Sequence, residues 1–263
     1  MANDPARQWA QNLVAGGYDA HCESEADVRR IARLGLAWRR ILRATGLKAP
    51  ASVFEIGCGG GEKLATLALN GFRGEGIDIS RDVLARARNY FREIEAQSRR
   101  KIEMELNEGD FLSHASERQF ALVYHSGVVE HYLDADSRRS FWNAAYGLTA
   151  PGGWIVSIVP CGRHIMRRKM RDRELYGYRR ELAEIDYSSR LHIEEFRNCG
   201  LVKIRSLPHG FFFFLSSHPS RAIRKFVYPA LSGFALLVSP MVPSRFSERF
   251  AHTLIVIGQK PGG

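Results

Sequence analysis

Apolar and polar positions follow two different periods along residues 50–160. Short apolar runs, such as 52–56, alternate with stretches in which apolar residues recur every three or four positions, such as 82–96. The first pattern is typical of buried strands and the second of amphipathic helices. The predicted strands are 52–56, 74–79, 101–106, 120–124 and 154–159, and the predicted helices are 62–69, 82–96 and 136–148. Alternating strands and helices predict an α/β fold, a parallel sheet with helices on both faces.

The same reasoning extends to both ends of the chain. Positions 27–44 place apolar residues at helical spacing, with Asp27 as a cap and Thr45-Gly46 as a stop, and so predict one amphipathic helix. After Pro160 the regular alternation ends. The elements predicted there are a short helix at 193–198 and strands at 201–207 and 253–257.

The composition is that of a folded protein, because 45% of the 263 residues are hydrophobic and can bury a sizeable core. This length suits one domain with insertions, so we expect residues 1–263 to form a single domain. The four cysteines show neither a CxxC pair nor metal-ligand spacing, which disfavours a disulfide framework and a zinc site. Residues 1–12 are too polar for a signal peptide, and the sequence indicates a cytoplasmic protein.

The net charge of +10 belongs to one part of the chain. Residues 1–160 contain 20 basic and 20 acidic side chains, whereas residues 161–263 contain 18 basic and 8 acidic side chains. A uniformly basic chain would favour nucleic acid, but this division favours a local anionic partner for the second part. A solvated basic face explains the same excess equally well.

The strongest chemical signal is the segment 53–61, VFEIGCGGG. A predicted strand delivers Glu55 and then glycines at alternate positions into a tight turn before a helix. Glycines let a backbone approach a ligand because no Cβ intervenes. The dinucleotide pattern GxGxxG needs glycine at position 62, where this chain has Glu62, and the Gly-Lys-Ser/Thr ending of a phosphate-binding loop is absent. The acidic Glu55 suits a cationic ligand better than a pyrophosphate.

Two further acidic positions follow the next two predicted strands. Asp78 ends the second strand, where a carboxylate can accept both hydroxyls of a ribose. Asp110 follows the third strand and can accept a hydrogen bond from an exocyclic amine, with Phe111 against a purine ring. A helix cap is the alternative role for Asp110.

Taken together, these segments resemble the class I S-adenosylmethionine-dependent methyltransferases, particularly the small-molecule branch (type 11) that includes ubiquinone-type O-methyltransferases. The resemblance covers about 50–207 and the final predicted strand. It rests on ExGxGxG at 55–61, on Asp78, on GDF at 109–111, and on LTAPGG at 148–153, which is similar to the family's L-x-PGG turn. It implies a Rossmann-like sheet of seven strands, mostly parallel, with 253–257 as the antiparallel last strand.

By that resemblance the cofactor is S-adenosyl-L-methionine, the product is S-adenosyl-L-homocysteine, and no metal is expected. The glycines of the turn would pass beneath the methionine part, Asp78 would hold the ribose, and Asp110 and Phe111 would flank the adenine. The residues expected at the cofactor are Glu55, Gly57, Cys58, Gly59, Gly61, Asp78, Ile79, Asp110, Phe111 and His125.

The segment 125–131, HSGVVEH, follows the fourth strand and is expected to face the cofactor pocket. Some quinone-biosynthetic members carry E-x-x-E-H here and use it to hold a divalent metal. Gly127 stands at the first position of that triad, so only Glu130 and His131 remain and metal dependence is disfavoured. His131 is the candidate general base, with Glu130 as its catalytic companion, because the ordinary pKa of histidine is about 6.5. A structural histidine behind the pocket is the alternative.

The N-terminal segment and the insert after the fifth strand usually cover the substrate in this family. Here they are 1–46, a helical lid, and 161–190, a cap insert, on either side of the cofactor-binding core at 50–160. The candidate substrate contacts are Tyr18, His21, Arg163, Arg167 and His192. Arginines in the cap insert would grip a carboxylate or phosphate of the acceptor, and a solvated helix face is the alternative.

Residues 208–250 form an apolar and basic insert before the last strand. No charged residue occurs from Phe226 to Ser244, and five arginine or lysine residues flank that stretch. Its prolines, and the return of the chain to the sheet, disfavour a spanning helix. A hydrophobic cap or homodimer surface is favoured, and peripheral contact with a membrane interface is the alternative.

The sequence therefore predicts an enzyme of biosynthesis that transfers a methyl group by in-line displacement. The expected acceptor atom is oxygen, in preference to nitrogen, on a small or lipid-linked metabolite. An RNA methyltransferase is the alternative within enzymes, and it is disfavoured because no recognition module is present. A non-catalytic binding subunit with the same fold is the alternative outside enzymes, and the intact pocket motif argues against it.

Overall fold

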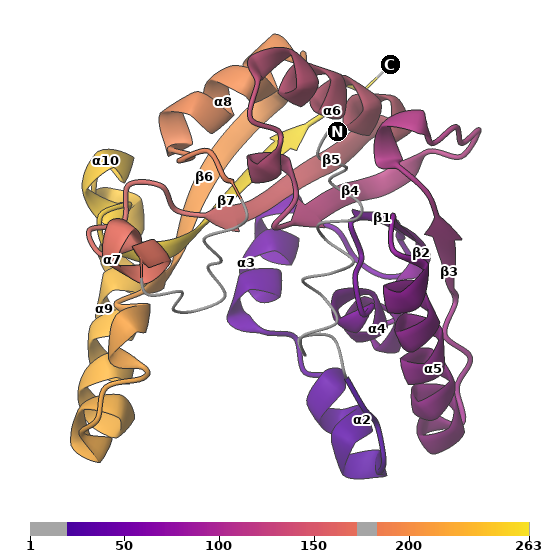
Figure 1. The fold of residues 1–263 in the computed structure, drawn as a ribbon, viewed down its shortest axis with the longest axis horizontal. Helices are drawn as coiled ribbons and strands as arrows, with labels where there is room; N and C mark the ends of the chain where they lie inside the picture. Colours follow the sequence, from indigo (N-terminus) through magenta and orange to yellow (C-terminus); the bar gives the residue numbers. More distant parts are fainter. Residues whose placement is uncertain (1–19, 173–182, 263) are drawn as a thin grey trace. The chain divides into compact units, whose positions relative to one another are not determined.

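A computed structural model describes residues 20–172 and 183–262. Its strands in chain order are β1 (Ser52–Ile56), β2 (Arg73–Asp78), β3 (Met104–Glu108), β4 (Phe120–Ser126), β5 (Thr149–Pro160), β6 (Val202–Phe211) and β7 (Ala251–Gln259). They form one seven-stranded sheet in the order β3-β2-β1-β4-β5-β7-β6 (Figure 1). The pairs β1–β2, β1–β4 and β2–β3 are parallel, whereas β6–β7 is antiparallel. The predicted α/β fold with an antiparallel last strand is confirmed.

The helices divide between two compact units. They are α2 (Glu25–Ile31), α3 (Leu36–Thr45), α4 (Glu62–Leu69), α5 (Arg81–Ser98), α6 (Ala135–Leu148), α7 (Arg167–Asp172), α8 (Ser189–Asn198), α9 (Tyr228–Val238) and α10 (Ser244–Ser247). Within the described part of the chain, unit 1 comprises 20–126, 144–155 and Gly262, and unit 2 comprises 127–143 and 156–261. Single-domain organisation stays a prediction.

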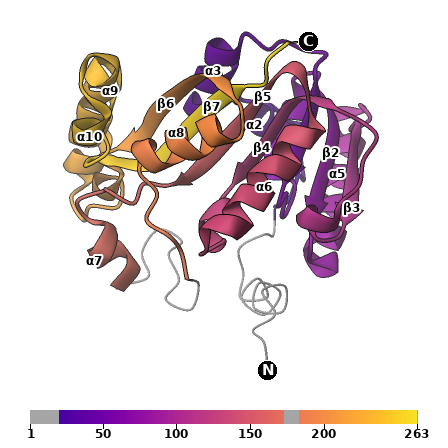
Figure 2. The same cartoon turned by 90° about the horizontal axis from the view of Figure 1, so that it is seen from above.

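Unit 1 owes its packing to two central strands, β1 and β4, that are buried along most of their length. Four of the five residues of β1 are buried, which suits a central strand of a parallel sheet. Helix α5 runs alongside β2 and β3 (Figure 2) and buries residues spaced three or four apart, from Val83 to Ile94. It begins at Ser80, whose Oγ accepts a hydrogen bond from the backbone N of Val83 at 3.4 Å.

The N-terminal helix predicted at 27–44 is in fact two helices, α2 and α3. Ser24 caps α2 instead of Asp27, with its Oγ accepting from the backbone N of Asp27 at 3.2 Å. Gly35 is extended at the start of α3, and the side-chain amide of Asn70 donates to the carbonyl O of Ala32 at 2.8 Å. The chain therefore breaks between Ile31 and Leu36, and a long-range hydrogen bond accompanies the break at the end of the first helix.

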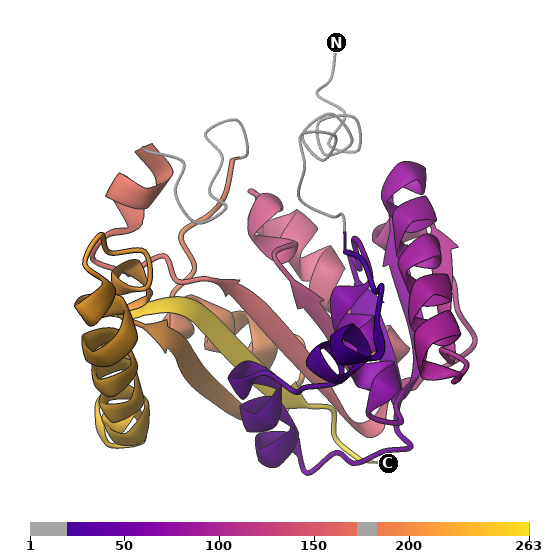
Figure 3. The same cartoon turned by 90° about the horizontal axis from the view of Figure 1, so that it is seen from below.

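Unit 2 is built on the antiparallel pair β6–β7, against which α8 packs. Trp142 of α6 and Phe196 of α8 lie edge to face in its core, with ring centroids 4.9 Å apart. Figure 3 shows α9 at the end of the β6–β7 pair. The insert predicted at 208–250 contains this helix, which the sequence did not predict. Helical spacing is recognised from a polar face, and α9 has none.

Candidate functional site

The glycine-rich turn between β1 and α4 lies in unit 1, at the carboxyl end of a central strand. Gly57, Gly59 and Gly61 have φ values of +65°, +53° and +76°, and residues other than glycine rarely adopt such backbone angles. A Cβ on Gly61 would stand 2.7 Å from a ring carbon of Phe91. Glycine is therefore required here by the backbone and by the packing of α5.

Asp78, the last residue of β2, holds this turn. Its Oδ2 accepts a hydrogen bond from the backbone N of Gly59, and its Oδ1 accepts one from the backbone N of Ser80, both at 2.9 Å. Each carboxylate oxygen can accept a further hydrogen bond. Burial raises the pKa of Asp78, while these backbone N–H groups act in the opposite direction. Asp78 is half-buried, so its remaining lone pairs are accessible to a ligand's hydroxyl groups.

Glu55 of β1 is buried beneath the turn. Its Oε2 accepts a hydrogen bond from the hydroxyl of Tyr124 at 3.0 Å, and Lys63 Nζ lies 3.9 Å from its Oε1. Among the described residues no hydrogen-bond donor reaches Oε1. Burial raises the pKa of Glu55 to about 7, so the group is poised between its two charge states near neutral pH. An unsatisfied buried carboxylate oxygen is a ready acceptor for a ligand's cationic donor.

Cys58 and Ile79 occupy the two loops that meet at this edge. The backbone N of Cys58 donates to the carbonyl O of Ile77 at 3.0 Å, and its side chain is buried. Ile79 is 36% exposed and offers an apolar surface beside Asp78. His125, the last residue but one of β4, pairs in register with Ile56 and is fully buried.

Asp110 and Phe111 follow β3, and the structure favours the alternative that sequence spacing left open for the aspartate. Asp110 caps a 3-10 turn at Phe111–Ser113, its Oδ1 accepting from the backbone N of Leu112 at 3.1 Å. Phe111 is only 5% exposed and packs near the ring of Phe54, at a centroid distance of 6.4 Å. Both residues have structural roles, so contact with an adenine stays a prediction.

The catalytic candidates lie on a 3-10 turn, Val129–His131, in unit 2. The carbonyl O of Ala183 accepts a hydrogen bond from Nδ1 of His131 at 3.1 Å, because a carbonyl cannot donate. Burial lowers the pKa of His131, which favours the neutral ring. A neutral ring protonated on Nδ1 has Nε2 as its acceptor. This tautomer suits a general base.

Glu130 is buried beside it. The carboxyl group is 2% exposed, its Oε2 has no hydrogen-bond partner among the described residues, and burial raises its pKa to about 8. The carbonyl O of Glu130 accepts from the backbone N of Ile185 at 2.9 Å. Glu130 is therefore mainly a neutral acid at pH 7, and the chain segment 183–187 holds its backbone.

The structure corrects the prediction that Arg167 grips an anionic substrate. Its guanidinium is buried, with Nε donating to Asp186 Oδ1 at 2.6 Å and Nη2 donating to Glu184 Oε2 at 2.9 Å. Two carboxylates already neutralise its charge. The residue ties α7 to the segment that holds the backbone of Glu130.

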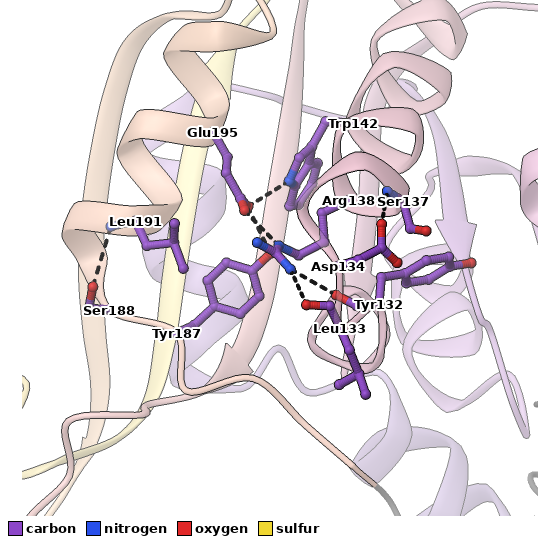
Figure 4. Close-up of polar contacts among 10 residues, drawn as sticks. All are labelled: Tyr132, Leu133, Asp134, Ser137, Arg138, Trp142, Tyr187, Ser188, Leu191 and Glu195. Atoms are coloured by element: carbon purple, nitrogen blue, oxygen red, sulfur yellow. Dashed lines mark hydrogen bonds and ion pairs between the residues drawn. The ribbon is translucent and has the colours of Figure 1, made fainter.

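A second buried polar cluster holds the backbone that directly follows His131 (Figure 4). Arg138 of α6 donates through Nε to Glu195 Oε1 at 2.7 Å and through Nη1 to the carbonyl O of Leu133 at 2.8 Å. Glu195 Oε2 also accepts from Trp142 Nε1 at 2.9 Å and from the hydroxyl of Tyr187 at 2.7 Å. Sequence reasoning missed this cluster because its ion pair joins residues 57 positions apart.

The other predicted substrate contacts fall in different places. Tyr18 lies outside the described residues. His21 is exposed, with Nδ1 3.5 Å from Glu93 Oε1, and Arg163 is exposed, with Nε 4.0 Å from Glu248 Oε2. His192 is fully buried, with its ring stacked on Tyr187 at a centroid distance of 4.3 Å, and burial lowers its pKa to about 3. It belongs to the core of unit 2, which corrects its predicted placement in a cap.

The segment 125–131 is also where a divalent metal would be held in some proteins that the sequence resembles. Among residues 20–172 and 183–262, no group of three or more His, Cys, Asp or Glu side chains is arranged to hold a metal ion. Glu130 and His131 thus stand without a third ligand in this part of the chain.

Comparison with known proteins agrees with the fold. Residues 54–155 match a family model described as a methyltransferase domain. A stretch of 104 residues is 30% identical to the ubiquinone biosynthesis O-methyltransferase of Hydrogenovibrio crunogenus (strain DSM 25203 / XCL-2) and covers 40% of each protein. The match therefore spans less than half the length of that curated relative.

Solved structures extend the likeness to nearly the whole chain. A SAM-dependent methyltransferase from Archaeoglobus fulgidus has a TM-score of 0.57 at 15% identity, over 98% of this chain and 100% of that one. Phosphoethanolamine N-methyltransferase 2 from Haemonchus contortus has a TM-score of 0.54 at 15% identity, over 96% of this chain and 56% of that one. The chain therefore has the fold of the class I S-adenosylmethionine-dependent methyltransferases, and its residues 54–155 are similar to a methyltransferase domain.

Proposed function

We propose that this protein binds S-adenosyl-L-methionine and transfers its methyl group to an oxygen atom of a small or lipid-linked metabolite, releasing S-adenosyl-L-homocysteine. The observation that carries the proposal lies at the carboxyl ends of β1 and β2 in unit 1. There a three-glycine turn, a half-buried aspartate and an unsatisfied buried carboxylate oxygen occur together.

These groups fit the proposed cofactor in kind. Asp78 would accept the ribose hydroxyls, because its oxygens retain lone pairs beyond their backbone hydrogen bonds. Glu55 Oε1 would accept a hydrogen bond from the ammonium group of the methionine part, because no donor reaches this oxygen among the described residues. Ile79 and the glycine turn would provide apolar and backbone contact. When bound, the cofactor supplies a methyl group activated by its sulfonium.

His131 would remove the acceptor's proton. Its Nδ1 hydrogen bond to Ala183 orients the ring and leaves Nε2 as the basic atom. The lowered pKa keeps that nitrogen unprotonated at neutral pH. Glu130, mainly neutral, already carries its proton, so proton uptake would fall to His131.

The choice of oxygen over nitrogen draws support from the curated relative, which is named as an O-methyltransferase. A base is needed more for a hydroxyl than for an amine, because an uncharged amine is nucleophilic before it loses a proton. The phosphoethanolamine N-methyltransferase among the structural relatives keeps nitrogen as the second choice.

Cofactor binding is tested by calorimetry with S-adenosyl-L-methionine. Asp78→Ala should weaken binding by about 10-fold to 100-fold, because two charge-assisted hydrogen bonds are lost. Asp82→Asn, on the exposed first turn of α5, is the matched control and should bind as the unaltered protein does. Absence of binding by the unaltered protein would sink the proposal and favour a non-catalytic subunit.

Catalysis is tested with cofactor labelled on its methyl group, offered with lipid, RNA and small-metabolite fractions. His131→Gln should keep its cofactor affinity and lose about 100-fold in turnover. Label in lipid or small metabolites, on oxygen, is the expected result. Label only in RNA would replace the proposal by a nucleic-acid methyltransferase, and full turnover of His131→Gln would remove the base assignment.

A further inference from the structure

Helix α9 in unit 2 is apolar on every side and yet buries none of its residues. Its sequence, YPALSGFALLV, has no charged residue, and no side chain in it is buried. Phe234 and Leu237 are 65% and 76% exposed, and Met241 just beyond the helix is 86% exposed. A helix that is hydrophobic all round is normally covered by protein or lipid. Water is therefore not the environment for which this surface is built.

The exposed charge within the segment 212–250, which contains α9, is entirely positive. The segment 212–250 contains the basic residues Arg221, Arg224, Lys225, Arg245 and Arg249. Its one acidic residue, Glu248, is 2% exposed, and its Oε1 accepts from the backbone N of Ser189 at 3.2 Å. We call this segment the basic–apolar face. It combines exposed apolar side chains with five basic residues, which suits an anionic amphiphilic partner.

Three arginines of unit 2 converge on one cavity at this face. It has a volume of about 730 Å³ and is lined by Arg163, Arg245, Phe246 and Arg249. The guanidinium carbon of Arg245 lies 5.0 Å from the centroid of the Phe246 ring. In the described part of the chain, neither Arg245 nor Arg249 forms an ion pair, and Arg163 approaches only Glu248, at 4.0 Å. The cavity has room and charge for a phosphate group.

We propose that the basic–apolar face docks onto an anionic lipid bilayer, with the arginine-lined cavity receiving a lipid phosphate. A second copy of this chain would bring like charges together, because a two-fold interface places the same patch on itself. A nucleic acid would satisfy the arginines but would leave the leucine and phenylalanine side chains of α9 in water. Only a lipid surface supplies both an apolar interior and anionic phosphates.

The helix would lie in the interface. Its 11 residues span about 16 Å at about 1.5 Å per residue, roughly half of the ~30 Å hydrocarbon core. Throughout residues 20–172 and 183–262, no helix combines the length and the apolar character needed to cross a bilayer. This docking is independent of the proposed methyl transfer, since it needs no cofactor.

The experiment is flotation of the full chain with vesicles of phosphatidylcholine alone or mixed with phosphatidylglycerol, at low and high salt. Binding is expected only to the mixed vesicles and should fall at high salt. Arg245→Ala with Arg249→Ala should weaken it by about 30-fold, at about 1 kcal/mol for each arginine. The control pair is Arg100→Ala with Lys101→Ala, two exposed cations of unit 1, and it should float normally.

The apolar half of the proposal has its own pair of variants. Phe234→Ser should also lose flotation, whereas Leu112→Ser, an exposed leucine of unit 1, should not. Calorimetry with S-adenosyl-L-methionine on every variant keeps folding and cofactor binding separate from docking. Flotation that ignores lipid charge, or no flotation at all, overturns the proposal. So does a concentration-dependent dimer in sedimentation that Phe234→Ser abolishes, because a second copy would then cover α9.

Discussion

At the scale of single residues, two of the buried glutamates should make the stability of this protein depend on pH. Glu55 and Glu130 are almost completely buried, and burial raises their pKa values to about 7 and about 8. Neither has a full set of hydrogen-bond donors among the described residues. Desolvation wins over the one nearby cation of Glu55 because Lys63 is 3.9 Å away and partly in solvent.

Glu130 gives a prediction with a definite sign. Its pKa is about 8 in the folded chain against an ordinary value of 4.5, so between those values the folded state binds more protons than the unfolded state. The free energy of unfolding should therefore fall as the pH rises from about 5 to 8. Glu130→Gln cannot ionise and should flatten this fall by up to about 1.4 kcal/mol per pH unit.

Urea unfolding at several pH values measures this slope. Glu103→Gln, at an exposed position, should keep the slope of the unaltered protein. Some slope should persist in Glu130→Gln because Glu55 contributes with the same sign. A slope identical to that of the unaltered protein would show that Glu130 is ionised when folded.

The conformation of the candidate site residues was predictable where it depends on local sequence. The glycines of the turn and Asp78 belong to short motifs, and their backbone angles and hydrogen bonds agree with them. Arg167 was misplaced because its partners, Glu184 and Asp186, lie 17 and 19 positions away, and nothing local distinguishes a paired arginine from an exposed one.

At the scale of elements, unit 2 is held together by the cluster around Glu195. One carboxylate on α8 accepts from Arg138 and Trp142 of α6 and from Tyr187 in the segment before α8. Arg138 in turn donates to the carbonyl groups of Tyr132 and Leu133, which directly follow His131. The cluster therefore connects helix packing to the position of the candidate base.

Removing that carboxylate should be costly. Glu195→Ala leaves a buried guanidinium, an indole N–H and a phenol without their acceptor, and is expected to destabilise the fold by about 3–5 kcal/mol. Thermal or urea unfolding measures the change. Glu194→Ala, at the exposed neighbouring position, should change stability by less than about 0.5 kcal/mol. If the two variants changed the free energy of unfolding equally, the cluster would not have the structural role described.

Elements were predicted well where a short apolar run or a helical period was clear. Strands β1 and β4 occur close to their predicted positions as short apolar runs, and helices α4 and α5 do so because their apolar residues recur at helical spacing. Helix α9 escaped prediction because a stretch that is apolar throughout has no periodic signal.

At the scale of the whole molecule, the net charge of +10 concentrates in residues 161–263, which belong almost entirely to unit 2. Unit 1 holds the residues proposed for the cofactor, and unit 2 holds the candidate base and the basic–apolar face. The charge excess therefore belongs to a different unit from the residues proposed for the cofactor.

The amino-acid sequence by itself determined the class of fold, the strand–turn–helix around the glycines, and the acidic residue after the second strand. These depend on periodicity and on backbone conformations that only glycine readily adopts, both of which are local. The tertiary structure alone decided which charged groups are buried and paired. It paired Arg167 with two carboxylates, buried Glu130 and placed α9 at the surface, because burial and pairing arise from contacts between distant parts of the chain.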